Sequence, residues 1–297
     1  MMITALLTSL MMLVCGMPRT AATETARTDD FQERDEINQT YQLAPGARVE
    51  VSSIRGPVEI VNGDGAMAQV QIVRTARTRA DLAHHKIDVQ LTGNSLVVRG
   101  IQEPEDVQRR NIQVNHHVIL KLPRTIDLAV SSISGPVKVA DVDGQTRVNS
   151  ISGPTTIGNV GGKLQVNSIS GSLDVGNVGA DARLNSISGN VDIGQVNGAL
   201  DVLSVSGGLK ATVTSLGPQG VHIKSVSGSI EIGFQNDVNA DFSAQGVSGR
   251  VYFDVPNVTR DSEEENRPNV RARIGSGGTP ISIQSVSGNI RLKRFMP

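Results

Sequence analysis

Aromatic side chains are almost absent from this sequence of 297 residues, which has five Phe, two Tyr and no Trp. In most globular proteins such rings supply a large share of the buried core, roughly 150–250 Å² each. A chain without them has to build its core from Val, Ile and Leu. We therefore expect a narrow, aliphatic core.

Cysteine is nearly absent as well, since Cys15 is the only one. It ends an apolar run from Ile3 that is too short to span a bilayer and is followed by small residues. We interpret residues 1–22 as a signal peptide that is cut after Ala22. Lipidation of Cys15 is the alternative, although Val14 stands where a lipidated cysteine needs a small residue. A mature chain without this cysteine can form no disulfide, so its stability has to come from elsewhere.

An excess of charge of either sign is also missing, because 28 Lys and Arg stand against 29 Asp and Glu. Binding to a nucleic-acid backbone requires a clustered surplus of Lys and Arg. Here basic residues form only short runs such as Arg109-Arg110. We therefore expect no nucleic-acid partner. From the signal peptide we predict an exported protein of the periplasm or cell surface that is not an integral membrane protein.

Repetition is what the sequence has in abundance, most visibly as Asn-Ser-Ile-Ser-Gly. The glycine that closes each Ser-(Ile/Val)-Ser-Gly unit recurs after 18 residues, then after 21 residues, and once after 39 residues. These glycines are Gly135, Gly153, Gly171, Gly189, Gly207, Gly228, Gly249 and Gly288. A fixed period is typical of a solenoid, in which each unit buries its apolar face only against its neighbours.

A nine-residue period within each unit indicates which solenoid this is. Apolar residues recur with spacings of two, three and four, as in Leu164, Val166, Ile169 and Leu173. The two-residue spacing places two side chains on one face of a strand, and glycine supplies the turn that follows. We predict an all-β fold, a β-solenoid with coils of about 18 residues and two nonamers per coil.

Two metal-dependent alternatives fit the sequence poorly. The calcium-binding nonapeptide roll needs an Asp in every unit, whereas the turns here read Gly-Asn-Val-Gly-Gly and Gly-Asn-Val-Gly-Ala. A zinc site would have to join His84-His85 and His116-His117 across two strands, because adjacent strand residues point to opposite faces. We expect these histidines to be ordinary exposed strand residues, and we expect no cofactor.

Stacked coils place equivalent residues roughly 4.8 Å apart, so repeated side chains form ladders. The candidate binding surface contains two such ladders, Asn149, Asn167, Asn185 and Ser152, Ser170, Ser188. Amides and hydroxyls in a ladder can hydrogen-bond to their own copies along the stack, which is the interpretation that we favour. The alternative is a flat polar face that binds glycans or ice, although threonine would serve ice better than serine.

The regions around the repeat are built from related segments. Val49–Gly65 matches Leu128–Gly144 at nine of seventeen positions, so residues 41–127 are predicted to be a strand-rich start of the same solenoid. Residues 23–40 are polar and charged, which predicts a disordered tether. The repeats then continue over residues 128–297.

A charged loop is predicted within the last repeats, at about residues 255–272. Long loops on a rigid scaffold often carry binding, so we add Glu263, Glu264 and Glu265 to the candidate binding surface. A run of charges that is merely solvated is the alternative. Aromatic residues gather near this loop, and we expect them at the wider, capped end of the core.

No catalytic motif is present, neither a Gly-x-Ser-x-Gly elbow nor a phosphate-binding loop nor His-Glu-x-x-His. The acidic candidates for catalysis are Asp174, Asp192 and Asp201, of which the first two stack in one column. Pectin-degrading solenoids group Asp, Lys and Arg in a groove on one sheet. We predict that this protein is not an enzyme, with a carbohydrate-active β-helix as the alternative.

The order of the segments resembles a known family. A strand that ends in Leu-Pro is followed by repeated Val-Asn-Ser-Ile-Ser-Gly coils, and Gly-Ser-Gly precedes the last coil. Over residues 41–293 the chain resembles the bacterial putative adhesins of unknown function, which are related to the head-domain repeat adhesins. The resemblance implies an exported β-solenoid at the cell envelope and supplies no catalytic residues.

We therefore expect a non-enzymatic, exported β-solenoid that acts as an adhesin or envelope scaffold. Its rigid surface would bind an envelope protein or a glycan. A periplasmic component of envelope-stress sensing fits the same residues and is a further alternative.

Overall fold

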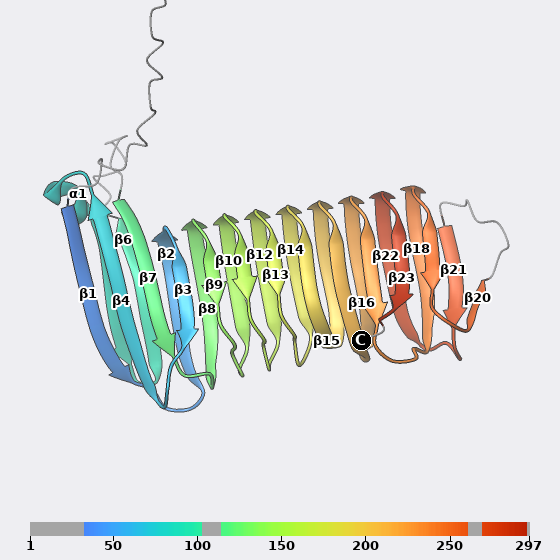
Figure 1. Ribbon diagram of the computed structural model, residues 1–297, viewed down its shortest axis with the longest axis horizontal. Coiled ribbons are helices and arrows are strands. Elements are labelled where there is room, and N and C mark those ends of the chain that lie inside the picture. The colour runs from blue at the N-terminus through green and yellow to red at the C-terminus, as the bar shows by residue number, and fades with distance from the viewer. Residues whose placement is uncertain (1–32, 103–113, 261–268, 296–297) are drawn as a thin grey trace, which may run out of the picture.

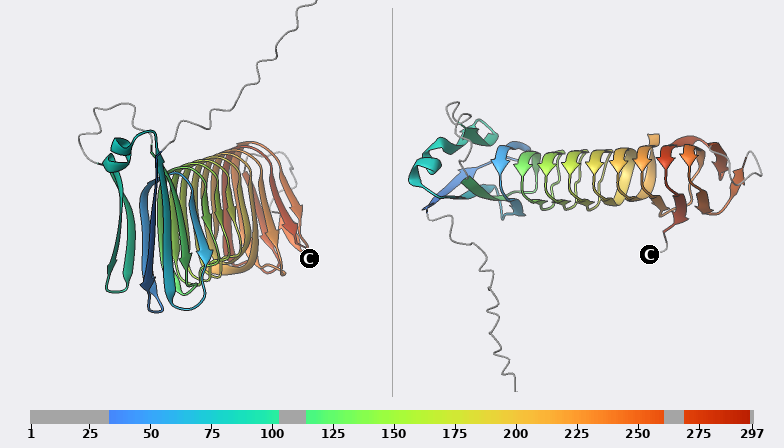
Figure 2. Two further views of the ribbon diagram at one scale, coloured as in Figure 1. Left: turned by 60° about the vertical axis from the view of Figure 1, so that its left-hand side comes forward. Right: turned by 90° about the horizontal axis from the view of Figure 1, so that it is seen from above.

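Each repeat of the sequence folds into one coil of a two-layered β-solenoid. The computed structural model describes residues 33–102, 114–260 and 269–295, so the predicted signal peptide lies outside it. In each regular coil a long strand crosses one layer, the chain turns, and a short strand returns across the other layer (Figure 1). We call these the wide layer and the narrow layer. The stack is long and flat, and the turned views show the two layers facing each other (Figure 2).

The strands of the regular coils pair in parallel. The wide layer contains β8 (Ile126–Ser134), β10 (Thr146–Ser152), β12 (Leu164–Ser170), β14 (Ala182–Ser188) and the second parts of β15 (Val191–Ser206) and β16 (Leu209–Ser227). The narrow layer contains β9 (Val137–Val139), β11 (Thr155–Ile157), β13 (Leu173–Val175) and the first parts of β15 and β16. From β8 to β15 each residue lies beside the one 18 positions later, as Val148 lies beside Val166. The predicted all-β solenoid is confirmed.

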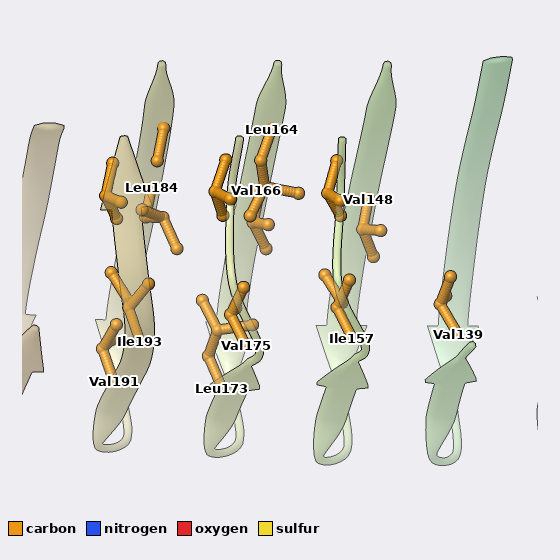
Figure 3. Close-up of a cluster of buried hydrophobic side chains, with 14 of the residues drawn as sticks. Val139, Val148, Ile157, Leu164, Val166, Leu173, Val175, Leu184, Val191 and Ile193 are labelled. Atoms are coloured by element: carbon orange, nitrogen blue, oxygen red, sulfur yellow. The ribbon is translucent and has the colours of Figure 1, made fainter. Parts of the chain in front are cut away.

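The core is one aliphatic stack between the two layers. In the wide layer alternate residues point inward, as Leu164 and Val166 do, and Leu173 and Val175 of the narrow layer face them. Figure 3 shows such side chains from successive coils filling the space between the ribbons. Equivalent positions repeat in every coil, so branched aliphatic residues that suit a pleated surface fill the core and few rings are needed.

The third apolar residue of the nonamer behaves differently in the two layers. Val178 of the narrow layer is buried, because the chain has already turned after Val175. Ile169 of the wide layer is 48% exposed, because β12 continues through it and Ser168 takes the inward place. The apolar period that reveals the nonamers therefore includes one position, that of Ile169, which lies outside the core. The two-residue alternation of a strand decides which side chain is buried.

The turn that ends each long strand requires glycine. Gly171 has a φ of +126°, and a Cβ there would lie 2.2 Å from the carbonyl oxygen of Gly153. Successive coils therefore approach backbone to backbone at this column. This close approach explains why the Ser-x-Ser pair is always followed by glycine.

The N-terminal part adds a coil beside β8 although it is distant in sequence. β2 (Ala47–Arg55) pairs in parallel with β8, and β3 (Val58–Asn62) pairs in parallel with β9, which confirms that both segments form the same unit. Further strands extend both layers. β6 (Ser95–Gln102) and β5 (His85–Thr92) continue from β2, while β7 (Val114–Leu122), β4 (Met67–Ala76) and β1 (Glu33–Gln42) continue from β3. The short helix α1 (Arg79–His84) connects β4 to β5.

Strand β1 shows that the prediction of a disordered tether over residues 23–40 is wrong where the two overlap. β1 pairs antiparallel with β4 along its whole length. The guanidinium of Arg74 forms an ion pair with Asp35, and Ile37 and Tyr41 pack against the core. An edge strand keeps charged residues on its exposed side and contains few apolar ones. The polar and charged composition of residues 33–40 is therefore typical of an edge strand as well as of a disordered tether.

At the C-terminal end the coils do not follow chain order. Next to β16 and β17 (Ile230–Phe234) lie β22 (Thr279–Ser287) and β23 (Ile290–Arg294), and only then come β18 (Ala240–Ser248) and β19 (Val251–Asp254). The chain thus leaves a gap, builds the outermost coil, and returns to fill the gap (Figure 1). The last strands of the chain are thereby paired on both sides rather than left at an edge.

The predicted loop at residues 255–272 is partly strand. β20 (Val258–Arg260) and β21 (Asn269–Ile274) form an antiparallel pair, and β21 also pairs with β18. Phe242 and Phe253 meet edge to face at this end, with ring centroids 5.0 Å apart. Glu263, Glu264 and Glu265 lie outside the described residues.

Removing one coil should shorten the solenoid without unfolding it. Deletion of residues 148–165 joins Arg147 to Val166, and Arg147 already lies in register with Gln165. We expect an unchanged β-type circular dichroism spectrum and, by small-angle scattering, a length reduced by about 4.8 Å. Deletion of only residues 148–156 exchanges the two layers and should prevent folding. Loss of the β spectrum in the first variant would contradict the interchangeable coils.

Candidate functional site

The outward side of the wide layer carries an apolar ladder. Its members occupy one position in six stacked strands and are Ile151, Ile169, Ile187, Val205, Val226 and Val286. Their exposed fractions lie between 44% and 51%. Pairing of the flanking serines, as between Ser168 and Ser186, aligns the ladder from strand to strand. Single exposed apolar side chains are ordinary on a protein surface, whereas a contiguous row marks a place of interaction.

Beside the apolar ladder lies the asparagine ladder that the sequence predicts. Nδ2 of Asn167 donates to Oδ1 of Asn149 at 2.7 Å, and Nδ2 of Asn185 donates to Oδ1 of Asn167 at 2.7 Å. Nδ2 of Asn149 donates onward to Oγ of Ser131 at 3.3 Å. These half-buried amides link neighbouring coils, and each retains a second N–H and a second lone pair for other contacts.

The serines of the motif form two columns with different surroundings. Ser152, Ser170 and Ser188 are exposed and in register, and no hydrogen bond joins their hydroxyls in the part of the chain that the structure describes. The serines two positions earlier, such as Ser150 and Ser168, point inward and are buried. Only the outer column is accessible to a ligand. Counting in twos from Val166 places Ser168 inward, whereas Ser170, which has the same parity, is exposed at the end of β12.

A groove of about 510 Å³ crosses the first residues of the wide strands on the same outward side. Small or buried side chains such as Ala129, Leu164 and Ala182 line it, together with a larger set of polar ones. The polar set is Arg48, Asp127, Gln145, Arg147, Lys163, Gln165, Asp181, Arg183, Asp201 and Gln219. These residues extend from β2 to β16, so the groove runs along the stack and across the strands.

The carboxylates of the groove are engaged by the protein itself. Asp181 accepts the backbone N–H of Ala199 at 3.0 Å and lies 3.3 Å from Nζ of Lys163. These contacts, the hydrogen bond above all, hold the pKa of the Asp181 carboxyl below its usual value. Asp201 pairs with Nε of Arg183 at 3.0 Å. The acidic groups therefore serve mainly to join one coil to the next.

Two guanidinium groups in the groove, unlike the carboxylates, have no hydrogen-bond or ion-pair partner among the described residues. Arg48 and Arg147 are exposed, and among the described residues neither side chain makes a hydrogen bond or an ion pair. On β8, the strand between them, Ala129 lies beside Arg147 and Asp127 lies beside Arg48. The carboxylate of Asp127 accepts the backbone N–H of Gln145 at 2.8 Å. Four cations and three carboxylates line the groove, which leaves it a net charge of +1.

The three carboxylates considered for catalysis are not brought together. Asp174 and Asp192 lie side by side on the exposed side of the narrow layer, and Asp192 is 4.0 Å from Nζ of Lys210. Asp201 lies in the groove of the wide layer. Glycoside hydrolysis needs two carboxyl groups that flank one bond in one cleft. These three residues do not provide that arrangement.

One histidine of each pair, His85 and His116, meets the other inside the protein. His85 and His116 are 5% and 3% exposed, with ring centroids 6.4 Å apart, so the prediction of exposed histidines is wrong for them. The cause is that β5 and β7 lie in opposite layers and both rings point inward. Within the described residues no third side chain of metal-ligand type joins them. Burial, together with the positive charges of His85, Arg74 and Arg55, lowers the pKa of His116 to about 4.

Sequence reasoning did not find the groove. The column Arg147, Gln165, Arg183 and Asp201 is visible in the repeat, but Arg48, which lies in register with Asp127, reaches the same groove from a distant segment through the pairing of β2 with β8. The internal match between those two segments was the available signal.

Among the described residues, no helix has both the length and the apolarity that are needed to cross a membrane.

Several solved structures of bacterial proteins are similar to this chain. A putative adhesin from Bacteroides fragilis is 14% identical with a TM-score of 0.46, over 87% of this chain and 97% of that one. A putative adhesin from Parabacteroides distasonis is 12% identical with a TM-score of 0.39, over 87% and 97%. A putative lipid binding protein from the same species is 10% identical with a TM-score of 0.25, over 88% and 97%. Likeness at this level carries no argument about function. No curated protein matches the chain in sequence.

A family model matches residues 47–293, which is well over half of the chain. The matched part begins with β2 and reaches into β23, so it includes every coil, the apolar ladder and the groove. The resemblance drawn from the order of the sequence motifs is thereby confirmed. The chain belongs to the Toastrack DUF4097 family.

Proposed function

We propose that the protein is a non-enzymatic, exported binding module of the bacterial envelope, an adhesin or scaffold that holds its partner on the wide layer. The apolar ladder carries this proposal. A sheet with one solvated face normally keeps apolar residues inward and polar residues outward. Here six neighbouring strands depart from that rule at the same position. The repeated cost of exposing branched apolar side chains is offset if a partner covers them.

The rigidity of the surface supports the same function. The amide ladder and the backbone contacts at the glycine column hold each coil to the next. A surface that is already ordered loses little conformational entropy when it binds, which improves affinity without new contacts. The partner that we propose is an envelope protein or glycan. Export to the periplasm or cell surface rests on the apolar run and small residues of segment 1–22, and the separation of Asp174 and Asp192 from Asp201 supports a non-enzymatic role.

Polar substitutions in the apolar ladder should abolish retention of the partner. Covering one half-exposed Ile or Val contributes about 1 kcal/mol, so Ile169→Ser, Ile187→Ser and Val205→Ser together should weaken retention roughly a hundredfold. The measurement is capture of envelope extract and of an arrayed glycan set by the immobilised chain from Thr23. The melting temperature should hardly change, because these side chains face solvent.

The matched control lies on the opposite side of the solenoid. Thr156→Ser with Lys210→Ser alters exposed residues of the narrow layer and should leave retention unchanged. Equal retention by the ladder variant and the native chain would refute the proposed surface. Release of reducing sugar during the same assay would show an enzyme instead.

A further inference from the structure

We propose that the groove at the start of the wide strands binds a linear acidic glycan, a polysaccharide whose repeating units carry carboxylates. The inference rests on the proposed function of the wide layer and names a ligand class for it. The main evidence for this inference is that two unpaired guanidinium groups, those of Arg48 and Arg147, line the same open groove of about 510 Å³.

The direction of the groove selects a long ligand. Its lining residues come from successive strands between β2 and β16, so a ligand in the groove crosses the strands. Equivalent positions recur along this line at the strand spacing of about 4.8 Å. A polymer with a short, regular repeat can therefore make similar contacts at successive coils. A small anion would occupy only part of this length.

The backbone of the groove favours a glycan over a peptide. Peptides bind to sheets by adding a strand at a free edge. Every wide strand from β2 to β16 already pairs with a strand on both sides, so its backbone groups are occupied. A ligand in the groove can contact only side chains. Amides such as Gln145 and Gln165 supply donors and acceptors that suit hydroxyl groups.

The charge of the groove favours an acidic glycan over a neutral one. The carboxylates of Asp181 and Asp201 are already paired with Lys163 and Arg183, whereas Arg48 and Arg147 have no partner among the described residues. Guanidinium groups bind carboxylates in a bidentate manner. The described residues that line the groove include no aromatic ring to cover the face of a neutral sugar.

Polygalacturonate is a suitable probe, because methyl esterification removes its charge without changing its backbone. We expect titration calorimetry of the full mature chain to show binding that weakens as salt is added. Esterified polygalacturonate and poly-L-glutamate should bind at least about tenfold more weakly, a difference of about 1.4 kcal/mol. Equal binding of the esterified polymer would refute recognition of charge. Equal or tighter binding of poly-L-glutamate would refute the glycan class.

Variants test whether the groove is the site. Arg147→Gln should weaken polygalacturonate binding about tenfold, and Arg48→Gln with Arg147→Gln about a hundredfold, since each removes one charge-assisted contact. Lys138→Gln removes the same charge from the exposed side of the narrow layer and is the matched control. All three variants should keep the native melting temperature. Binding that is unchanged in the double variant would overturn the proposal.

The two proposals fail in different ways. If the apolar-ladder variant loses envelope retention but polygalacturonate does not bind, the glycan inference is wrong and the proposed function stands. If polygalacturonate binding depends on the two arginines but the ladder variant retains envelope material normally, the proposed surface is wrong and the groove stands.

Discussion

Alanine at Gly207 is expected to destabilise the protein severely, whereas alanine at the next residue, Gly208, is expected to do almost nothing. Gly207 has a φ of +128°, and a Cβ there would lie 2.1 Å from the carbonyl oxygen of Gly189. At Gly208 the nearest atoms to a Cβ are side-chain oxygens of Asn190 and Ser229, at 3.6 and 3.7 Å. The two glycines are neighbours in one turn, but only Gly208 has room for a Cβ atom.

The expected difference follows from two separate costs. A side chain in a sparsely populated backbone conformation costs about 1–3 kcal/mol, and forcing extra atoms into a close contact costs about 1–3 kcal/mol more. Gly207→Ala should therefore lower the free energy of unfolding by about 4 kcal/mol, and Gly208→Ala by no more than about 0.5 kcal/mol.

Urea denaturation followed by circular dichroism measures both variants, and the slope of the transition shows whether the folded state has stayed compact. If both variants unfold at the same urea concentration as the native chain, the coils do not depend on backbone contact at this column. A loss at Gly208 as large as that at Gly207 would show a general intolerance of the turn instead.

Acidification should destabilise the N-terminal end of the solenoid through His116. The pKa of this buried ring is lowered to about 4 in the folded protein, from an ordinary value of 6.5, by burial first and then by the charges of His85, Arg74 and Arg55. Between these two values the unfolded chain binds the proton and the folded chain does not. Stability therefore falls as pH decreases from 6.5 to 4, by about 3 kcal/mol in total.

His116→Gln removes the titrating ring and should flatten this part of the stability profile. Its matched control is His117→Gln, because His117 is the next residue on β7 but faces solvent, 4.0 Å from Glu59. The free energy of unfolding is measured in urea at several pH values between 4 and 7. If the free energy of unfolding still depends on pH in His116→Gln but no longer does in His117→Gln, the buried ring is not the source of that dependence.

Much of the repeat was predictable because its determinants are local. The step from Val148 to Val166 gives the register of the coils, and Gly171 marks a turn that only glycine adopts without strain. The asparagine ladder also follows directly, since residues 18 positions apart become neighbours. Strand alternation was equally available, and it places Ser168 rather than Ile169 inward.

The candidate site was less predictable, because it depends on which distant segments become neighbours. The apolar ladder follows from the sequence once Ser168 is placed inward, yet the groove needs Arg48 of β2 beside a strand that comes much later in the chain. Nothing near Arg48 in the sequence indicates that it lacks a partner. Its significance appears only when the pairing of β2 with β8 is known.

The sequence by itself determined the coil, the two-layered solenoid and the aliphatic core, because strand alternation and glycine turns act over a few residues and repeat at a fixed period. Only the tertiary structure decided the order of the coils at both ends. Contacts between distant segments bring β22 and β23 back into the gap beside β16. Such contacts also bring His85 and His116 together across the two layers. Such contacts are selected by the free energy of closing the whole stack, which no local pattern encodes.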